Sequence, residues 1–226
     1  MFLLRPAPAT QASGQAAPRD ANLWNLPHTI TLPWLGLAAL FCCICMAVPQ
    51  VHLIALGIDL GCSPQTAAGL LLTVMVTAVF GRLFFGWLAD RTGGLPAYFL
   101  ASLAQTSVVF FFTQTKSIAT LYQLSVLFGF GFAGVMTCLL ICAREAAPLR
   151  LSGFAMAAVA TVGWVGMGFG SYQAGYFYDI SANYRLSFAN ATGAGVLNLL
   201  VVAALFWYRR ERNLMRSRAV ATSSPN

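Results

Sequence analysis

Six long apolar blocks dominate this sequence and restrict what it can fold into. A helix needs about 20 predominantly apolar residues, at 1.5 Å each, to cross the hydrocarbon core of a bilayer. The blocks cover residues 33–56, 65–88, 96–113, 119–142, 153–177 and 187–208, and short polar or turn-forming stretches separate them. Membrane-spanning β-strands would instead show segments of about 10 residues with alternating hydrophobicity, and the sequence has no such pattern. We therefore predict an all-α membrane protein with six transmembrane helices.

The composition supports a membrane location. Only 8% of the residues are charged, whereas soluble domains carry about 25%, so there are too few charges to cover a surface in water. Residues 1–32 are rich in Ala, Pro and Gln and contain no apolar run of signal-peptide length, which predicts a flexible cytoplasmic linker. Residues 33–208 form the predicted bundle, and residues 209–226 form a basic tail.

The positive charges are distributed unequally between the two sides of this predicted bundle. An even number of spans places both termini on one side of the membrane. That side carries ten arginines, namely Arg5, Arg19, Arg91, Arg144, Arg150, Arg209, Arg210, Arg212, Arg216 and Arg218. The opposite side carries only Lys116 and Arg185. Basic loops stay in the cytoplasm, so we expect a multi-pass protein of the plasma (inner) membrane with both termini cytoplasmic. This pattern accounts for the net charge of +7 without nucleic-acid binding, which we do not expect.

The cysteines do not indicate a metal or cofactor site. Five of the six lie inside predicted helices, where thiols behave as small apolar groups. Only Cys62 falls in a predicted external loop, and it has no obvious partner there. We expect neither a metal nor a cofactor.

Small residues recur at helix-packing spacing in the second and fifth blocks. The second block carries Gly69, Thr73, Thr77 and Gly81, which are four residues apart and therefore share one face. The fifth block carries Gly163, Gly166, Gly168 and Gly170. Such stripes allow the backbones of membrane helices to approach closely, which predicts tight helix pairs.

Three stretches of the sequence resemble motifs of a known family. The segment Gly86-Trp87-Leu88-Ala89-Asp90-Arg91-Thr92-Gly93 resembles the G-x-L-A-D-R-x-G loop of the major facilitator superfamily, although Gly94 and Leu95 replace the usual basic pair. Residues 170–188 are similar to the passage from helix 11 to helix 12 in monocarboxylate-type and oxalate/formate-type members, with Ser171 and Asn183 replacing a proline and a glycine. Residues 144–153 are similar to the preceding loop of the same members.

This resemblance implies a specific fold and function. The six helices correspond to helices 7 to 12, the C-terminal half of a twelve-helix transporter. The two halves of such a transporter rock around a central cavity and expose it alternately to each side. A missing six-helix N-terminal half, or a second copy, is the expected partner. Gly86, Asp90, Arg91 and Gly93 are expected to form a conformational latch. The expected activity is secondary transport of a small organic anion, with a monocarboxylate as the favoured substrate, and not enzymatic catalysis.

Arg82 is the main candidate for binding that substrate. It lies inside the second block, where an ionisable group is costly and usually faces an interior pathway. In monocarboxylate-type members, the resemblance places a carboxylate-binding arginine at this position, and a guanidinium can hold a carboxylate through two parallel hydrogen bonds. Alternatively, Arg82 extends to the headgroups or pairs with a carboxylate of the missing half. The absence of charges between Gly153 and Phe177 leaves one visible counter-charge, which favours a monoanion.

His52 and Tyr172 are the other candidate substrate contacts. His52 follows Pro49 near the outer end of the first block, where an imidazole can relay a proton or simply face water. Tyr172 is polar within the membrane and, like Asn198, either binds ligand or joins helices.

Two other classes of function compete with transport. A rhomboid-type intramembrane protease would need a Ser–His pair, for which Ser171 and His52 are the available residues, but the usual G-x-S-G context is missing. A half-protein that does not transport, acting as a partner subunit or inactive, is the stronger alternative.

Overall fold

The structure is a computed structural model, and it describes residues 23–24 and 26–223, with side chains to residue 215. The described part contains six long helices and no strand. The helices are α1 (His28–Asp59), α2 (Pro64–Thr92), α3 (Gly94–Phe111), α4 (Ile118–Ala146), α5 (Ser152–Ser181) and α6 (Arg185–Ser223), with a short 3₁₀ turn, η1 (Leu149–Leu151), before α5. All six, within the described residues, are long and apolar enough to cross a membrane. The prediction of six spans in an all-α protein is confirmed.

Local signals fix where several helices begin and end. The Ser63 hydroxyl accepts a hydrogen bond from the backbone N–H of Thr66 (3.2 Å), and Pro64 occupies the first helical position of α2. Ser117 caps α4 in the same way, through the N–H of Thr120. Gly93 alone joins α2 to α3, with a φ of +88° that only glycine adopts readily.

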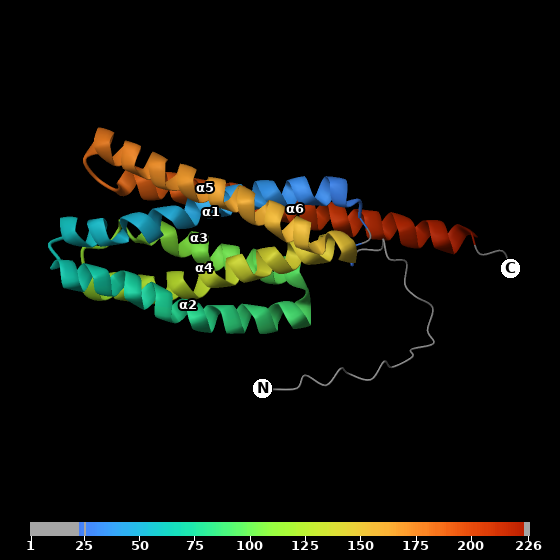
Figure 1. Cartoon of the computed structure of the whole chain (residues 1–226), viewed down its shortest axis with the longest axis horizontal. Helices are drawn as coiled ribbons and strands as arrows, with labels where there is room; N and C mark the ends of the chain where they lie inside the picture. Colours follow the sequence, from blue (N-terminus) through green and yellow to red (C-terminus); the bar gives the residue numbers. More distant parts are fainter. Residues whose placement is uncertain (1–22, 25, 224–226) are drawn as a thin grey trace, which may run out of the picture.

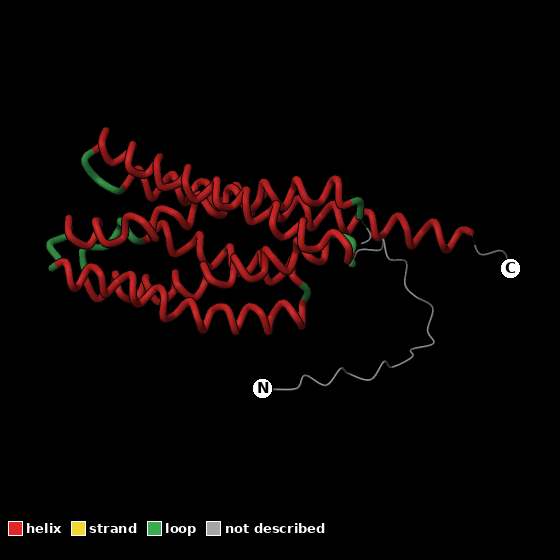
Figure 2. The backbone as a smooth tube through the Cα atoms, viewed as in Figure 1, coloured by secondary structure: helices red, strands yellow, loops and turns green. Residues whose placement is uncertain are grey.

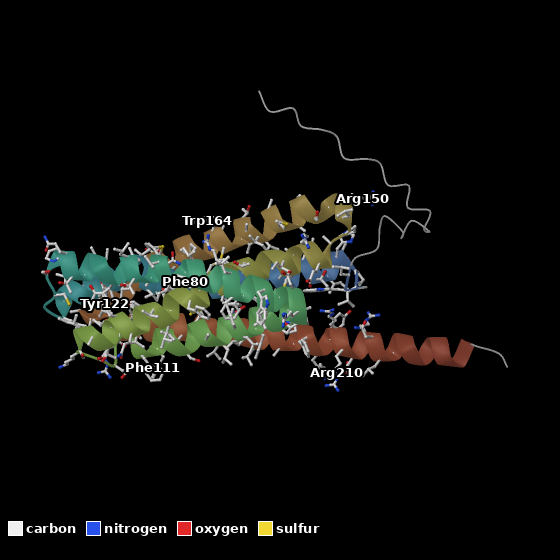
Figure 3. All side chains as sticks on the ribbon, turned by 90° about the horizontal axis from the view of Figure 1, so that it is seen from below. Phe80, Phe111, Tyr122, Arg150, Trp164 and Arg210 are labelled. Carbon is white, nitrogen blue, oxygen red and sulfur yellow. The ribbon has the colours of Figure 1, made fainter. Side chains whose placement is uncertain are left out.

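The six helices run lengthwise, and their connections alternate between two ends (Figures 1 and 2). One end holds the start of α1, the α2–α3 and α4–α5 connections and the last part of α6; we call it the basic end. Arg150 and Arg210 lie at this end, whereas Phe111 and Tyr122 lie at the opposite end (Figure 3). This arrangement matches the alternation on which the charge argument rests.

The helices form two packed groups. α1 packs chiefly against α5 and α6, while α4 packs chiefly against α2 and α3, and α3 also contacts α6. α2 and α5 are the least buried spans: 28% and 22% of their most apolar segments are covered, against 61% in α1 and α4. These two helices therefore present large apolar faces that the described residues do not cover.

Glycines bring the paired helices close together. A Cβ on Gly81 would collide with the backbone carbonyl of Phe130, and one on Gly129 would collide with Thr77 and the backbone of Val74, so α2 and α4 touch through their main chains. Gly166 and Gly170 approach Leu40 and Ile44 of α1 in the same way. Gly168 faces open space instead. The expected tight pairs are confirmed for α2–α4 and α1–α5.

Polar side chains inside the bundle join helices to one another. The Tyr98 hydroxyl of α3 donates to the Asn198 side-chain carbonyl of α6 (2.9 Å), and the Asn198 amide donates to the Ser102 hydroxyl (3.1 Å). All three residues are buried. Asn198 therefore connects helices, which was one of its two expected roles.

Helical structure extends into both flanking segments. α1 begins at His28, inside the segment expected to be a linker, and the Trp24 indole is buried and donates to a Glu145 carboxylate oxygen (2.9 Å). Residues 1–22 lie outside the described residues. α6 continues past Tyr208 to Ser223, because arginine-rich sequence favours helix. At 39 residues, α6 is about 58 Å long, nearly twice the roughly 30 Å hydrocarbon core.

Candidate functional site

A partly open cavity of about 430 Å³ lies between α1, α2, α4 and α5. This volume falls within the range of small-molecule sites, which is roughly 300–1,000 Å³. Its lining residues are Cys43, Met46, Gln50, Met75, Arg82, Phe132, Met136, Thr137, Leu140, Ala160, Gly163, Trp164 and Met167. Most of them recur three, four or seven residues apart within a helix, with Phe132, Met136 and Leu140 as one example, so each helix contributes one face to the cavity.

Arg82 is the only charged residue among those lining this cavity. Its side chain is exposed at the cavity surface, and no described residue forms an ion pair or hydrogen bond with its guanidinium. The hydrogen-bonding capacity of a guanidinium in a largely apolar wall is therefore free for a ligand or for another part of the assembly. Trp164, another lining residue, lies on α5 (Figure 3).

The remaining polar groups of the wall are few. Thr137 donates its hydroxyl hydrogen to the backbone carbonyl of Ala133 (3.0 Å), so its donor is already used. The Gln50 carboxamide has no hydrogen-bond partner among the described residues. Arg82, Gln50 and the indole N–H of Trp164 are therefore the groups of this wall that can donate hydrogen bonds to a ligand.

His52 and Tyr172 do not line this cavity. The His52 Nε2 lies 3.2 Å from the backbone carbonyl of Ser171, and its ring centroid lies 5.6 Å from that of Tyr184. A carbonyl oxygen only accepts, so Nε2 carries the hydrogen and joins α1 to α5. Burial, with the negative charge of Asp59, raises the pKa of Tyr184, which therefore remains a neutral phenol beside His52.

Helix geometry explains these positions. His52 is two residues beyond Gln50, which rotates it by about 200° around α1, and Tyr172 is five residues beyond Met167, an offset of about 140° on α5. Tyr172 is 73% exposed on the outer surface of the bundle. The structure thus brings Arg82 together with Gln50, and places His52 and Tyr172 elsewhere in this half.

The Ser171–His52 pair lacks the contact that nucleophilic catalysis requires. A base must reach the nucleophile's hydroxyl. Here the Ser171 hydroxyl donates to the Met167 carbonyl (2.8 Å), and His52 contacts only the main chain of Ser171. This geometry does not support the protease alternative.

The segment from Gly86 to Gly93, expected from the sequence to act as a latch, forms a tight corner at the basic end. The N–H of Gly93 donates to the Ala89 carbonyl (2.8 Å) and closes α2, and the next N–H, of Gly94, donates to a Glu145 carboxylate oxygen (3.2 Å). The Arg91 guanidinium lies 4.3 Å from the centre of the Trp87 ring. Asp90 is exposed and forms no ion pair with any described residue. Gly86 faces open space, so any close partner of these two residues lies outside the described part.

Sequence reasoning did not single out Gln50, Glu145 or the apolar cavity wall as functional. The helical spacing of Met46 and Gln50, and of Met75 and Arg82, was a usable signal, because residues four or seven apart share a helix face. Glu145 was visible as an acid at a helix end, but its contacts with Trp24 and Gly94 join segments far apart in the sequence.

Comparison with known proteins identifies the family. A sequence profile of the Major Facilitator Superfamily matches residues 34–222. The chain belongs to the major facilitator superfamily. It is 31% identical over 158 residues to Monocarboxylate transporter 13 of Rattus norvegicus and 27% identical over 157 residues to that of Bos taurus, matches that cover 66% of this chain and 37% of each relative. It is 24% identical over 209 residues to an MFS-type transporter of Aspergillus fumigatus, covering 85% of this chain and 47% of that protein.

The match confirms the expected architecture at the level of the fold. The chain spans between 37% and 47% of the length of these curated relatives, and its six apolar helices form one half of the major facilitator fold in a multi-pass membrane protein. This superfamily consists of transporters, which points away from the enzyme alternative.

Proposed function

We propose that this chain forms one half of a secondary transporter for a small organic monoanion, a monocarboxylate, and that Arg82 binds the substrate carboxylate. The observation that carries the proposal is a guanidinium, without an ion-pair or hydrogen-bond partner among the described residues, in the wall of a cavity between four membrane helices. The relatives named as monocarboxylate transporters support the choice of substrate class.

The second half of the transporter would complete the cavity. α2 and α5 carry the most exposed apolar surface of the bundle, and the Gly86 backbone is open to close approach. Alternating access would follow from rocking of the two halves. Both termini would be cytoplasmic in the plasma membrane, with the basic end facing the cytoplasm.

Substitution of Arg82 tests this proposal. Cells carrying the chain at its own genomic locus are compared with cells in which the locus is deleted, and uptake of radiolabelled monocarboxylates is measured as the difference. We expect Arg82→Ala to abolish this uptake, because a desolvated carboxylate without a partner is strongly disfavoured. Arg82→Lys keeps the charge but loses the planar pair of donors, so we expect a large increase in KM.

Arg212→Ala is the matched control, because Arg212 lies on α6 beyond the cavity and donates to the Tyr208 hydroxyl (3.2 Å). It should leave uptake unchanged. Wild-type KM in Arg82→Ala would assign the arginine a structural role. No locus-dependent uptake of any anion would favour the alternative of a non-transporting half-protein.

A further inference from the structure

The wall of the Arg82 cavity is apolar almost everywhere except at Arg82 and Gln50. Thirteen residues line the cavity, and ten of them remain when Arg82, Gln50 and Thr137 are set aside. The Thr137 hydroxyl already donates its hydrogen to a backbone carbonyl. Four of those ten are methionines, Met46, Met75, Met136 and Met167, and two are aromatic, Phe132 and Trp164. A ligand in this cavity therefore meets the donors of Arg82 and Gln50, a single indole N–H from Trp164, and a surrounding wall of thioethers and rings.

Such a wall disfavours small hydrophilic acids. A hydroxyl group on the substrate loses its hydrogen bonds with water and finds few partners here, which is costly in an apolar environment. A second carboxylate would lie against methionine side chains without a counter-charge in this half. The wall therefore stabilises neither a substrate hydroxyl group nor a second carboxylate.

The same wall favours an apolar body. Methionine side chains are flexible and polarisable, so they adjust to irregular shapes and make favourable contacts with aromatic rings. Aromatic rings such as Trp164 and Phe132 add offset or edge-to-face contacts with a ligand ring. Trp164 is 71% exposed in this half, so its ring is accessible to a ligand.

The charged and apolar parts of the wall are separated along the helices. Met75 lies seven residues before Arg82 on α2, which is about 10 Å along the helix axis. The face formed by Phe132, Met136 and Leu140 spans about 12 Å on α4. A ligand with its carboxylate at Arg82 can therefore extend an apolar chain or ring toward Met75, away from the basic end.

We infer that the substrate is an amphipathic monocarboxylate with a bulky aromatic or branched aliphatic body, and not a short hydroxy acid or a dicarboxylate. This inference rests on the proposed function, since it assumes that Arg82 binds the carboxylate. In addition, the apolar wall of the cavity determines which substrate body binds beside the carboxylate.

The test uses locus-dependent uptake in the same cells, with labelled 3-phenylpropionate, acetate, lactate and succinate. Burial of a phenyl-bearing chain predicts a KM for 3-phenylpropionate about 10- to 100-fold below that for acetate. The neutral amide, 3-phenylpropionamide, should compete poorly because it lacks the carboxylate. Lactate and succinate should show no advantage over acetate.

Substitutions in the wall separate this inference from the proposed function. Met136→Gln and Met167→Gln keep the side-chain length but add polar atoms, so they should raise the KM for 3-phenylpropionate severalfold and leave that for acetate unchanged. Met215→Gln, on α6 outside the cavity, is the matched control and should change neither. If Arg82-dependent uptake favours acetate, lactate or succinate, the apolar-body inference is overturned while the proposed function stands. If uptake of 3-phenylpropionate is independent of Arg82 or of the locus, both are overturned.

Discussion

At the scale of single residues, Gly93 determines how two membrane helices meet. Its backbone angles, φ +88° and ψ 159°, lie in a region that only glycine occupies without strain. This conformation ends α2 and directs the next N–H, that of Gly94, toward Glu145. One residue thus supplies both the turn and the contact with α4.

Gly93→Ala should therefore destabilise the bundle by about 1–3 kcal/mol, the cost of placing a Cβ in this backbone region. Unfolding of the purified chain in mixed detergent micelles, followed by circular dichroism, measures the change. Gly86→Ala is the control, because its Cβ would meet no described atom and alanine favours helix. Equal destabilisation by both substitutions would contradict the assigned role of the Gly93 backbone.

The binding residues were only partly predictable from the sequence. A lone arginine in an apolar block stands out whatever surrounds it, so Arg82 was found. Gln50 and Trp164 did not stand out, because their importance depends on which faces of four helices converge. His52 and Tyr172 are equally conspicuous in the sequence, yet their rotation around α1 and α5 directs them away from that convergence. Their roles as substrate contacts remain predictions.

At the scale of elements, two glycine-lined contacts hold the bundle together. α2 meets α4 at Gly81 and Gly129, and α5 meets α1 at Gly166 and Gly170. Close backbone approach increases van der Waals contact, which is a main source of helix association in lipid. The cavity lies among these same four helices, so its width depends on both contacts.

Gly129→Ala should weaken the α2–α4 contact by about 1–3 kcal/mol, because overpacking forces the backbones apart. The added Cβ would lie 2.9 Å from the Val74 Cα, which cannot rotate away. The same unfolding experiment measures the loss. Gly168→Ala, whose Cβ would meet open space on α5, should be neutral or slightly stabilising. No difference between the two variants would show that this contact contributes little.

The six spans were predictable because a bilayer requires a minimum apolar length, and each block supplied it. The helix ends were not predictable from that requirement. α1 starts before the first block and α6 continues far beyond the last, since a helix ends where its backbone is capped or broken and not where its apolar residues stop.

At the scale of the whole molecule, the alternation of connections and the excess of arginines at the basic end together predict a definite orientation in the membrane. Reporter fusions after Thr115 and after Arg212 should be found on opposite sides of the membrane, with the Arg212 fusion in the cytoplasm. Phosphatase and fluorescent-protein reporters give complementary readouts of the two locations. Detection of both fusions on one side would contradict the six-span topology with cytoplasmic termini.

The exposed faces of α2 and α5 predict that the chain does not transport alone. One six-helix bundle supplies one wall of a cavity, and a permeation pathway needs the other. Liposomes reconstituted with the purified 226-residue chain should show no substrate uptake above that of protein-free liposomes. Uptake by a preparation shown to be monomeric would contradict this expectation, and uptake that appears only with dimers would identify a second copy as the partner.

The one-residue connection at Gly93 also has a consequence for biogenesis. α3 is the shortest and least apolar of the described spans and buries Ser102, Gln105 and Thr106. Such a segment gains little from entering lipid by itself, because each polar group would be unsatisfied there. With no loop between them, α2 and α3 cannot enter the bilayer far apart in time. Insertion of the more apolar α2 would therefore bring α3 into the bilayer with it, as a helical hairpin. An insertion machinery would have to accommodate both helices at once.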